Sequence, residues 1–365
     1  MAVHDQLQLG ILATIVGLVV GVVLFVPFVA LSYRRRGGLS LSRLILWAGA
    51  LVYFWAIWAY TLLPLPDPDT MRCAGVNLDP FELVTDIRNG LASPGPWISD
   101  PGILQLLLNV LLFVPLGFFI RVLGGRGIIV AGLVGVTLTL FIETTQLTGV
   151  WGVYPCAYRV FDVDDMITNT TGALVGSIVA LLVPARMRGI ARAADADEPR
   201  PVTRGRRALA IFCDVVGFTA VSVTVSIGVV LWLEYVVQAH DLVAETDVAG
   251  IAGTITALVL WSVIGLVTGA SPGDLAVMLR YRGGSLSPLL TRPLRMLGGI
   301  VSFTVLDTLP DPWSLAGVIF LLVAVITFFA TRAGRGLPGL LTGQTLVDAR
   351  GDAVNPAAGM SDHPA

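Results

Sequence analysis

The chain has 365 residues, of which 55% are hydrophobic and only 13% charged, and its mean hydropathy is +0.82. This composition excludes an ordinary soluble domain and indicates an integral membrane protein. The formal net charge is −2 and there is no basic surface, which excludes nucleic acid as a partner.

Nine hydrophobic segments are long enough to cross a bilayer, because about 20 helical residues span its hydrocarbon core. In chain order they are residues 9–33, 44–63, 103–122, 127–147, 166–183, 208–237, 248–268, 289–309 and 313–331. The eighth has Arg292 and Arg295 near its start and Asp307 near its end, so a re-entrant or tilted segment is the alternative there. The sequence therefore predicts an all-helical polytopic membrane protein with five plus four spans.

Arginines cluster in alternate loops between these segments. Examples are Arg34, Arg35 and Arg36 after the first span and the arginine-rich stretch 186–207 after the fifth. Positively charged loops stay in the cytoplasm, which places the amino terminus outside and the carboxyl terminus inside. The opposite loops, 64–102, 148–165 and 240–247, are acidic or neutral and are expected on the extracytoplasmic side.

The stretch 185–205 separates the first five spans from the last four. It is rich in Arg, Ala, Asp and Pro and has no apolar periodicity, which predicts a cytoplasmic linker. The expected domains are therefore 9–184 and 206–348. Residues 349–365 are rich in Gly, Pro and Ala and predict a disordered tail.

A set of polar residues lies at one end of the spans between residues 109 and 176, and we interpret it as a binding site. The set is Asn109, Glu143, Gln146, Arg159, Asp162, Asp165 and Asn169. Polar groups are costly in lipid, so this many at one membrane level indicate a functional pocket. On the predicted topology the pocket faces the extracytoplasmic side, and Arg159 is available to a phosphate or carboxylate.

Structural roles are the alternative for some of these residues. Asp162 and Asp165 fall where the fifth span begins, and an acid there can accept hydrogen bonds from the free backbone N–H groups. Glu143 lies about one turn inside its span and needs a partner. A network of Glu143, Arg159 and Asp162 is the structural interpretation, because buried charges need pairing.

Catalysis has little support in these motifs. The three histidines lie outside them, and no Ser or Cys nucleophile has a base beside it. We therefore expect a binding protein and not an enzyme, and no cofactor. Acid and base chemistry by Glu143 with Asp162 or Asp165, or binding of a divalent cation by these oxygens, stays open.

The three cysteines differ in their expected surroundings. Cys73 and Cys156 fall in loops on the predicted outer side, whereas Cys213 lies in the sixth span. Disulfides form in oxidising compartments, so we predict a bond between Cys73 and Cys156. It would tie the long outer loop over the loop that carries Arg159.

Short motifs follow one another in a fixed order along the first half of the chain. They are Asn77-Leu78-x-Pro80-Phe81, Asn109-x-x-x-Phe113-x-Pro115-x-Gly117, Glu143-x-x-Gln146 and Arg159-x-x-Asp162-x-x-Asp165-x-x-x-Asn169-x-x-Gly172-x-x-x-Gly176. The last two glycines have the spacing that lets membrane helices approach closely. Residues 9–184 resemble the VanZ-like family in these motifs.

The resemblance implies a protein of the bacterial plasma membrane with a part in cell-envelope biology and in tolerance to glycopeptide antibiotics of the teicoplanin type. The expected ligand of the pocket is a membrane lipid, a lipid-linked envelope precursor such as a glycan, or the antibiotic itself. A membrane enzyme that acts on such a lipid through its carboxylates is one alternative.

The second half carries fewer signals. Arg206 or Arg207 precedes a helix with Asp214, and a later turn reads Gly269-x-x-Pro272-Gly273-Asp274, followed by Leu279-Arg280. Residues 204–348 resemble a diverged RDD domain in this pattern, with Asp274 where that family has Lys. Transport of a small solute or ion is the second functional alternative, along a path of Glu143, Asp162, Asp214 and Asp307.

Overall fold

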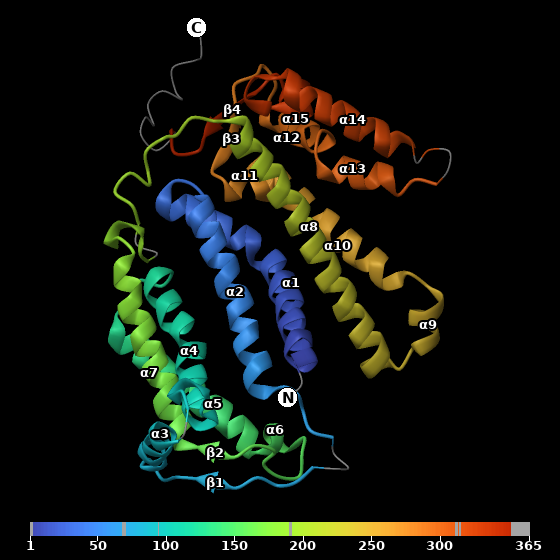
Figure 1. Ribbon diagram of the computed structural model, residues 1–365. Coiled ribbons are helices and arrows are strands. Elements are labelled where there is room, and N and C mark those ends of the chain that lie inside the picture. The colour runs from blue at the N-terminus through green and yellow to red at the C-terminus, as the bar shows by residue number, and fades with distance from the viewer. Residues whose placement is uncertain are drawn as a thin grey trace. The chain divides into compact units, whose positions relative to one another are not determined.

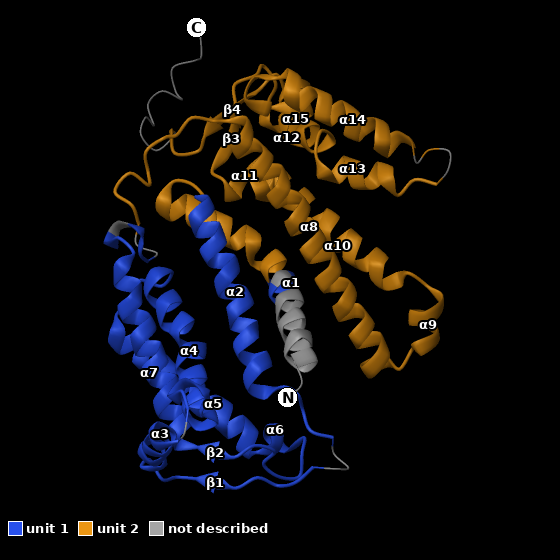
Figure 2. Ribbon diagram, viewed as in Figure 1, with its two compact units in different colours: residues 1–20, 40–191 blue, residues 21–39, 192–365 orange. Residues whose placement is uncertain are grey.

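The computed structural model describes residues 3–67, 71–93, 95–189, 192–310, 313 and 315–351. The chain divides into two compact units (Figure 2). Unit 1 consists of Met1–Val20 and Ser40–Ala191, and unit 2 of Gly21–Leu39 and Arg192–Ala365. The first helix, α1 (Val3–Arg36), therefore contributes its first part to unit 1 and its second part to unit 2.

Unit 1 is built mainly from four long apolar helices (Figure 1). They are α2 (Leu41–Leu62), α4 (Pro101–Val122), α5 (Ile128–Leu147) and α7 (Val163–Val179). The strand β1 (Val76–Asn77) and the helix α3 (Glu82–Ala92) lie between α2 and α4, and α6 (Gly149–Gly152) and β2 (Phe161–Asp162) precede α7. Asp100 begins α4 by accepting hydrogen bonds from the main-chain N–H groups of Gly102 and Ile103, with Pro101 at the first helical position.

Glycines allow α4 and α7 to pack with their backbones in contact. A Cβ atom added at Gly176 would lie 1.8 Å from the Val114 carbonyl oxygen, and one added at Gly172 would lie 2.2 Å from that of Val110. The same holds for a glycine of α4: a Cβ atom added at Gly117 would lie 1.8 Å from the carbonyl oxygen of Ala173 on α7. The small residues are thus required on both helices, as the spacing of Gly172 and Gly176 predicts.

Unit 2 contains two long helices, several shorter ones and one antiparallel pair of short strands. The helices are α8 (Arg204–Trp232), α9 (His240–Glu245), α10 (Val248–Thr268), α11 (Pro272–Ala276), α12 (Pro288–Leu297), α13 (Ile300–Asp307), α14 (Leu315–Ala330) and α15 (Gly336–Thr342). The strands are β3 (Leu279–Arg282) and β4 (Thr345–Asp348). A π-helical turn, Leu233–Val237, extends α8.

Six helices in the described residues are long and apolar enough to cross a membrane, or seven if one bent pair is a single span. The bent pair is α12 and α13, which meet at 47° across Gly298 and Gly299, in the segment for which the sequence leaves a re-entrant or tilted course as the alternative to a full span. The fold therefore supports a multi-pass membrane protein. The number of nine spans and the orientation of the termini stay predictions.

The fold is mostly helical, as the sequence predicts, and two small sheets are added to the helices. β1 pairs in parallel with β2, with Asn77 opposite Asp162, and β3 pairs antiparallel with β4, with Leu279 opposite Asp348. Strands of two to four residues are too short to show the alternating pattern by which a strand is recognised in a sequence. The remaining elements are helical.

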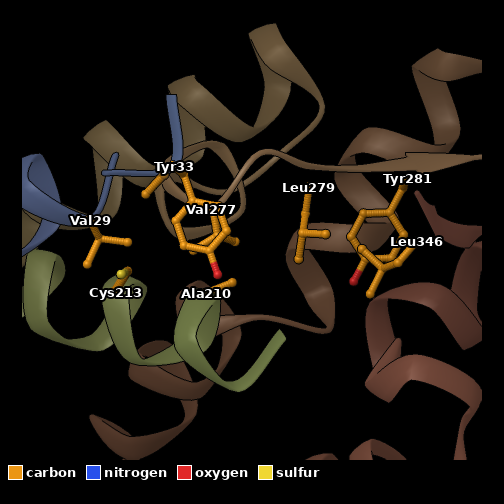
Figure 3. Close-up of a cluster of buried hydrophobic side chains, with 9 residues drawn as sticks. Val29, Tyr33, Ala210, Cys213, Val277, Leu279, Tyr281 and Leu346 are labelled. Carbon is orange, nitrogen blue, oxygen red and sulfur yellow. The ribbon is translucent and has the colours of Figure 1, made fainter. Parts of the chain in front are cut away.

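The core of unit 2 joins the carboxyl half of α1 to residues much later in the chain (Figure 3). Its buried side chains are Val29, Tyr33, Ala210, Cys213, Ala276, Val277, Leu279, Tyr281 and Leu346. Arg350 is only 4% exposed and donates hydrogen bonds to Asp348, although the sequence predicts a disordered tail from residue 349. Arg350 is therefore part of the folded unit, and residues 352–365, on which the predicted tail falls, lie outside the described residues.

A disulfide joins Cys73 to Cys156, with 5.5 Å between their Cα atoms, and confirms the predicted pairing. It lies next to the β1 and β2 pair, because Ala74 donates a main-chain hydrogen bond to the Ala157 carbonyl. The bond closes a loop of 83 residues.

Replacing both cysteines with serine should lower the free energy of unfolding of unit 1 by up to about 4.5 kcal/mol, because a long loop regains its entropy in the unfolded chain. Thermal unfolding of the purified protein, followed by tryptophan fluorescence, measures the loss. Wild-type protein treated with a reductant should unfold at the same lowered temperature as the double variant. An unchanged midpoint in both samples would contradict the stabilising role.

Candidate functional site

The predicted polar set lies at one end of the unit 1 helices. α2 and α5 end there, at Leu62 and Leu147, and α4 and α7 begin there, at Pro101 and Val163. A helix end leaves unsatisfied main-chain groups, carbonyls at the end of a helix and N–H groups at its beginning. Much of the polar set binds these main-chain groups.

The end of α2 holds Gln146 and Arg159 through a single carbonyl oxygen. Gln146 Nε2 donates to the Thr61 oxygen at 2.7 Å, and Arg159 NH1 donates to the same atom at 2.9 Å. Tyr158 donates from its hydroxyl to the next carbonyl, that of Leu62, at 3.3 Å. Burial raises the pKa of the Tyr158 phenol, so it stays protonated and remains a donor.

Asp162 begins α7, as its position in the sequence predicts. Its Oδ1 accepts from the Asp164 N–H at 2.9 Å and from Asn77 Nδ2 at 3.2 Å. The Asp162 N–H in turn donates to Glu143 Oε2 at 3.1 Å. Glu143, which is 2% exposed, therefore binds the main chain at the beginning of α7.

The remaining members of the polar set join α7 to its neighbouring helices. Asn109 on α4 donates from Nδ2 to Asp165 Oδ1 at 2.5 Å. Asn169 donates from Nδ2 to Thr139 Oγ1 on α5 at 3.0 Å, while its buried Oδ1 has no hydrogen-bond partner among the described residues. The polar set is thus joined mainly through pairwise and main-chain hydrogen bonds, while its charged members Glu143, Asp162, Asp165 and Arg159 lie close enough to interact electrostatically.

Arg159 does not form the predicted network with Glu143 and Asp162. Within the described residues its guanidinium makes one hydrogen bond, to Thr61, and no ion pair with either carboxylate. The physical reason is that each carboxylate already accepts from a main-chain N–H at the start of α7, whereas the last turn of α2 offers a carbonyl to the arginine.

A cleft of about 680 Å³ opens beside Arg159 and Asn109. Its wall is mainly apolar and comes from α2 and α4, with Tyr53, Tyr60 and Gln105 adding polar groups. The other lining residues are Pro101, Leu104, Leu108, Leu111, Leu112 and Pro115. Of the predicted set, only Asn109 and Arg159 line this cleft, and the others lie outside its lining.

Sequence reasoning did not single out the contributions of Tyr53, Tyr60, Gln105 and Thr61. Gln105 lies four residues before Asn109 on the same helix, and this spacing places the two side chains on one face. That spacing is the signal by which Gln105 could have been found. Thr61 acts through its carbonyl oxygen, so its residue type gives no signal.

The described residues contain no group of three or more His, Cys, Asp or Glu side chains that could hold a metal ion. Glu143, Asp162 and Asp165 are instead engaged with main-chain N–H groups or with Asn109. At the edge of the cleft, Arg159 offers hydrogen bonding and charge attraction next to apolar surface.

Comparison with known proteins gives one match. The chain matches no curated protein and no solved structure. The resemblance of the second half to an RDD domain stays a prediction. Residues 44–184, which include the cleft and the whole polar set, match the model of the VanZ/LLP1 family. This part of the multi-pass membrane protein is therefore similar to the VanZ/LLP1 family, and we refer to it as the VanZ-like domain.

Proposed function

We propose that the VanZ-like domain binds the headgroup of an envelope lipid or of a lipid-linked glycan in the cleft beside Arg159, on the extracytoplasmic side. Occupation of the cleft would alter the access of teicoplanin-type antibiotics to the cell envelope. The observation that carries the proposal is a guanidinium without an ion-pair partner among the described residues, held at the edge of a mainly apolar cleft.

The guanidinium is positioned for an anion. An arginine side chain has five N–H donors, and Arg159 uses one nitrogen to bind the Thr61 carbonyl. This contact fixes the side chain, and its other donors remain for a phosphate or carboxylate, which arginine binds with two parallel hydrogen bonds. An exposed arginine held by the backbone loses less freedom on binding than a mobile one.

The wall of the cleft is suited to the apolar part of an amphiphilic ligand. Leucines of α4 supply apolar surface, and Asn109, Gln105 and Tyr60 supply a few polar groups, the combination that is typical of small-molecule sites. The volume of about 680 Å³ lies within the range of about 300–1,000 Å³ for such sites. A headgroup with its first lipid segment fits this chemistry better than a small ion does.

The arrangement favours binding over catalysis. A catalytic carboxylate must reach its substrate, and neither Glu143 nor Asp165 lines the cleft. Both are engaged in contacts that hold α7 to α5 and α4.

The proposal predicts that Arg159→Gln weakens binding of a polyprenyl phosphate about tenfold or more, since charge-assisted hydrogen bonds contribute about 1.5–3 kcal/mol. Purified protein in nanodiscs can be titrated with this lipid by tryptophan fluorescence. Arg88→Gln is the matched control, because Arg88 is exposed on α3 and does not line the cleft.

Equal affinity of Arg159→Gln and Arg88→Gln would overturn the assignment. The same pair of variants should then be expressed in a bacterium, and its growth in teicoplanin measured. Loss of tolerance with Arg159→Gln alone would connect the cleft to the antibiotic. Loss of lipid binding with unchanged tolerance would separate the binding function from the antibiotic role.

A further inference from the structure

Two adjoining cavities lie within unit 2 and differ in the chemistry of their walls. The smaller, of about 80 Å³, is lined by Arg207, Arg292 and Arg295, and we call it the arginine cavity. The larger, of about 200 Å³, is lined mainly by apolar side chains of α8, α13, α14 and α15, and we call it the apolar cavity. Both cavities share the lining residues Arg207, Asp214, Gly299, Ile300 and Pro338.

Arg207 lines both cavities, and one of its hydrogen-bond donors has no acceptor among the described residues. It is 6% exposed and pairs with Asp274, which is 2% exposed. Its buried Nε has no hydrogen-bond partner among the described residues. A buried donor without an acceptor is unfavourable, and an added anion in the arginine cavity could supply one.

The second carboxylate that lines the arginine cavity, that of Asp214, is stabilised by hydrogen bonds from uncharged donors. Asp214 accepts from Trp261 Nε1 at 3.0 Å, from the Gly273 N–H at 2.8 Å and from the Ser271 hydroxyl at 2.5 Å. Three donors without a full charge therefore stabilise it. Asp214 leaves the guanidinium groups of the cavity available to another anion.

Arg292 and Arg295 also lack a carboxylate partner within the described part of unit 2. Arg292 NH1 donates to the Leu266 carbonyl at 2.9 Å, and the Arg295 guanidinium lies over the Tyr281 ring at 5.2 Å from its centre. Three guanidinium groups thus face a cavity in which, among the residues that the structure describes, only that of Arg207 has an ion-pair partner. The excess positive charge selects an anionic group.

We propose that the two cavities together bind an anionic lipid, with its phosphate in the arginine cavity and part of one acyl chain in the apolar cavity. Phe303, Phe320, Phe328 and Ala324 line the apolar cavity, where the acyl chain would lie. Basic pockets between membrane helices are suited to phosphate headgroups, and the predicted topology puts these arginines at the cytoplasmic face. The site is separate from the cleft beside Arg159.

Native mass spectrometry of the full chain in detergent tests the proposal with dioleoyl phosphatidic acid and, in a parallel sample, dioleoyl phosphatidylcholine. The wild-type protein should retain one phosphatidic acid. Arg295→Gln should lower its affinity about tenfold or more. Ala324→Phe, which fills the apolar cavity, should lower it as well, while Arg332→Gln, an exposed residue outside both cavities, should not.

Inorganic phosphate, added as a competitor, separates a lipid site from a site for the free anion. Displacement of the lipid by an equal concentration of phosphate would overturn the role of the apolar cavity. Equal retention of phosphatidylcholine, or equal affinities of Arg295→Gln and Arg332→Gln, would overturn the role of the arginines. Slow maleimide labelling of the buried Cys213 in each variant shows that unit 2 is folded.

Discussion

Gly176→Ala is expected to destabilise unit 1 by about 3 kcal/mol or more, because overpacking a tight contact costs about 1–3 kcal/mol even where the neighbours can adjust. The new methyl carbon would lie 1.8 Å from the Val114 carbonyl oxygen and 2.7 Å from its carbon. Both atoms belong to the backbone of α4, so no side-chain rotation relieves the clash. The helices must separate, and the lowered unfolding midpoint in detergent measures the cost.

Gly49→Ala on α2 is the matched control for this substitution. The nearest atom to its added Cβ is Phe119 Cζ at 3.7 Å, an ordinary contact. Alanine is favoured over glycine within a helix by about 1 kcal/mol, so this variant should be as stable as the wild type or more stable. Equal midpoints for Gly176→Ala and Gly49→Ala would show that α4 and α7 are not in backbone contact.

The second large effect is expected from Asp348→Ala, which should cost unit 2 about 3–5 kcal/mol. Asp348 accepts from Arg206 NH1 at 2.8 Å and from Arg350 NH2 at 2.8 Å, and these three side chains are at most 7% exposed. Removal of the carboxylate leaves two buried guanidinium groups without their counter-charge. The rate of maleimide labelling at Cys213, which is free and buried in the core of unit 2, measures the opening of this unit.

Asp197→Ala is the control, because Asp197 forms an ion pair with Arg192 at the surface. Their side chains are 72% and 60% exposed, and such pairs contribute between zero and about 1 kcal/mol. Similar labelling rates for the two variants would mean that the buried cluster around Asp348 contributes no more than an exposed pair.

The same cluster predicts a loss of stability in acid. Burial by itself raises the pKa of Asp348, but the hydrogen bonds from Arg350 and Arg206 outweigh burial and hold the pKa below its usual range. A carboxyl group with a lowered pKa in the folded state stabilises the protein above its unfolded pKa of about 3.9, and this stabilisation is lost as the pH falls further. The unfolding midpoint should therefore fall less steeply below pH 4 in Asp348→Asn than in the wild type.

The sequence was sufficient where a residue's role depends on its position along a helix or on its predicted side of the membrane. Asp162 is found at the beginning of α7, and Cys73 and Cys156 form the predicted disulfide. The close approach at Gly172 and Gly176 follows from small residues four positions apart. These features need only helical periodicity and hydropathy, which a single chain displays.

The sequence was not sufficient where the partner is a main-chain atom. Arg159 binds the Thr61 carbonyl and Glu143 binds the Asp162 N–H, although charge alone suggested that these side chains pair with each other. Which carbonyls and N–H groups are free depends on the residue at which each helix ends, and helix ends are the least certain part of a prediction. For the same reason the side chains lining the cleft could not be selected in advance.

The division of α1 between the two units has a consequence for biosynthesis. Val29 and Tyr33, which are synthesised before the whole α2 to α7 segment, belong to the same core as Ala210 and Leu346. Unit 2 can therefore complete its core only after Leu346 has been translated, and the α2 to α7 segment of unit 1 is synthesised in between. A gene cut within residues 185–205 would give a carboxyl-terminal fragment without Gly21–Leu39, and co-expression of the amino-terminal piece would have to restore it.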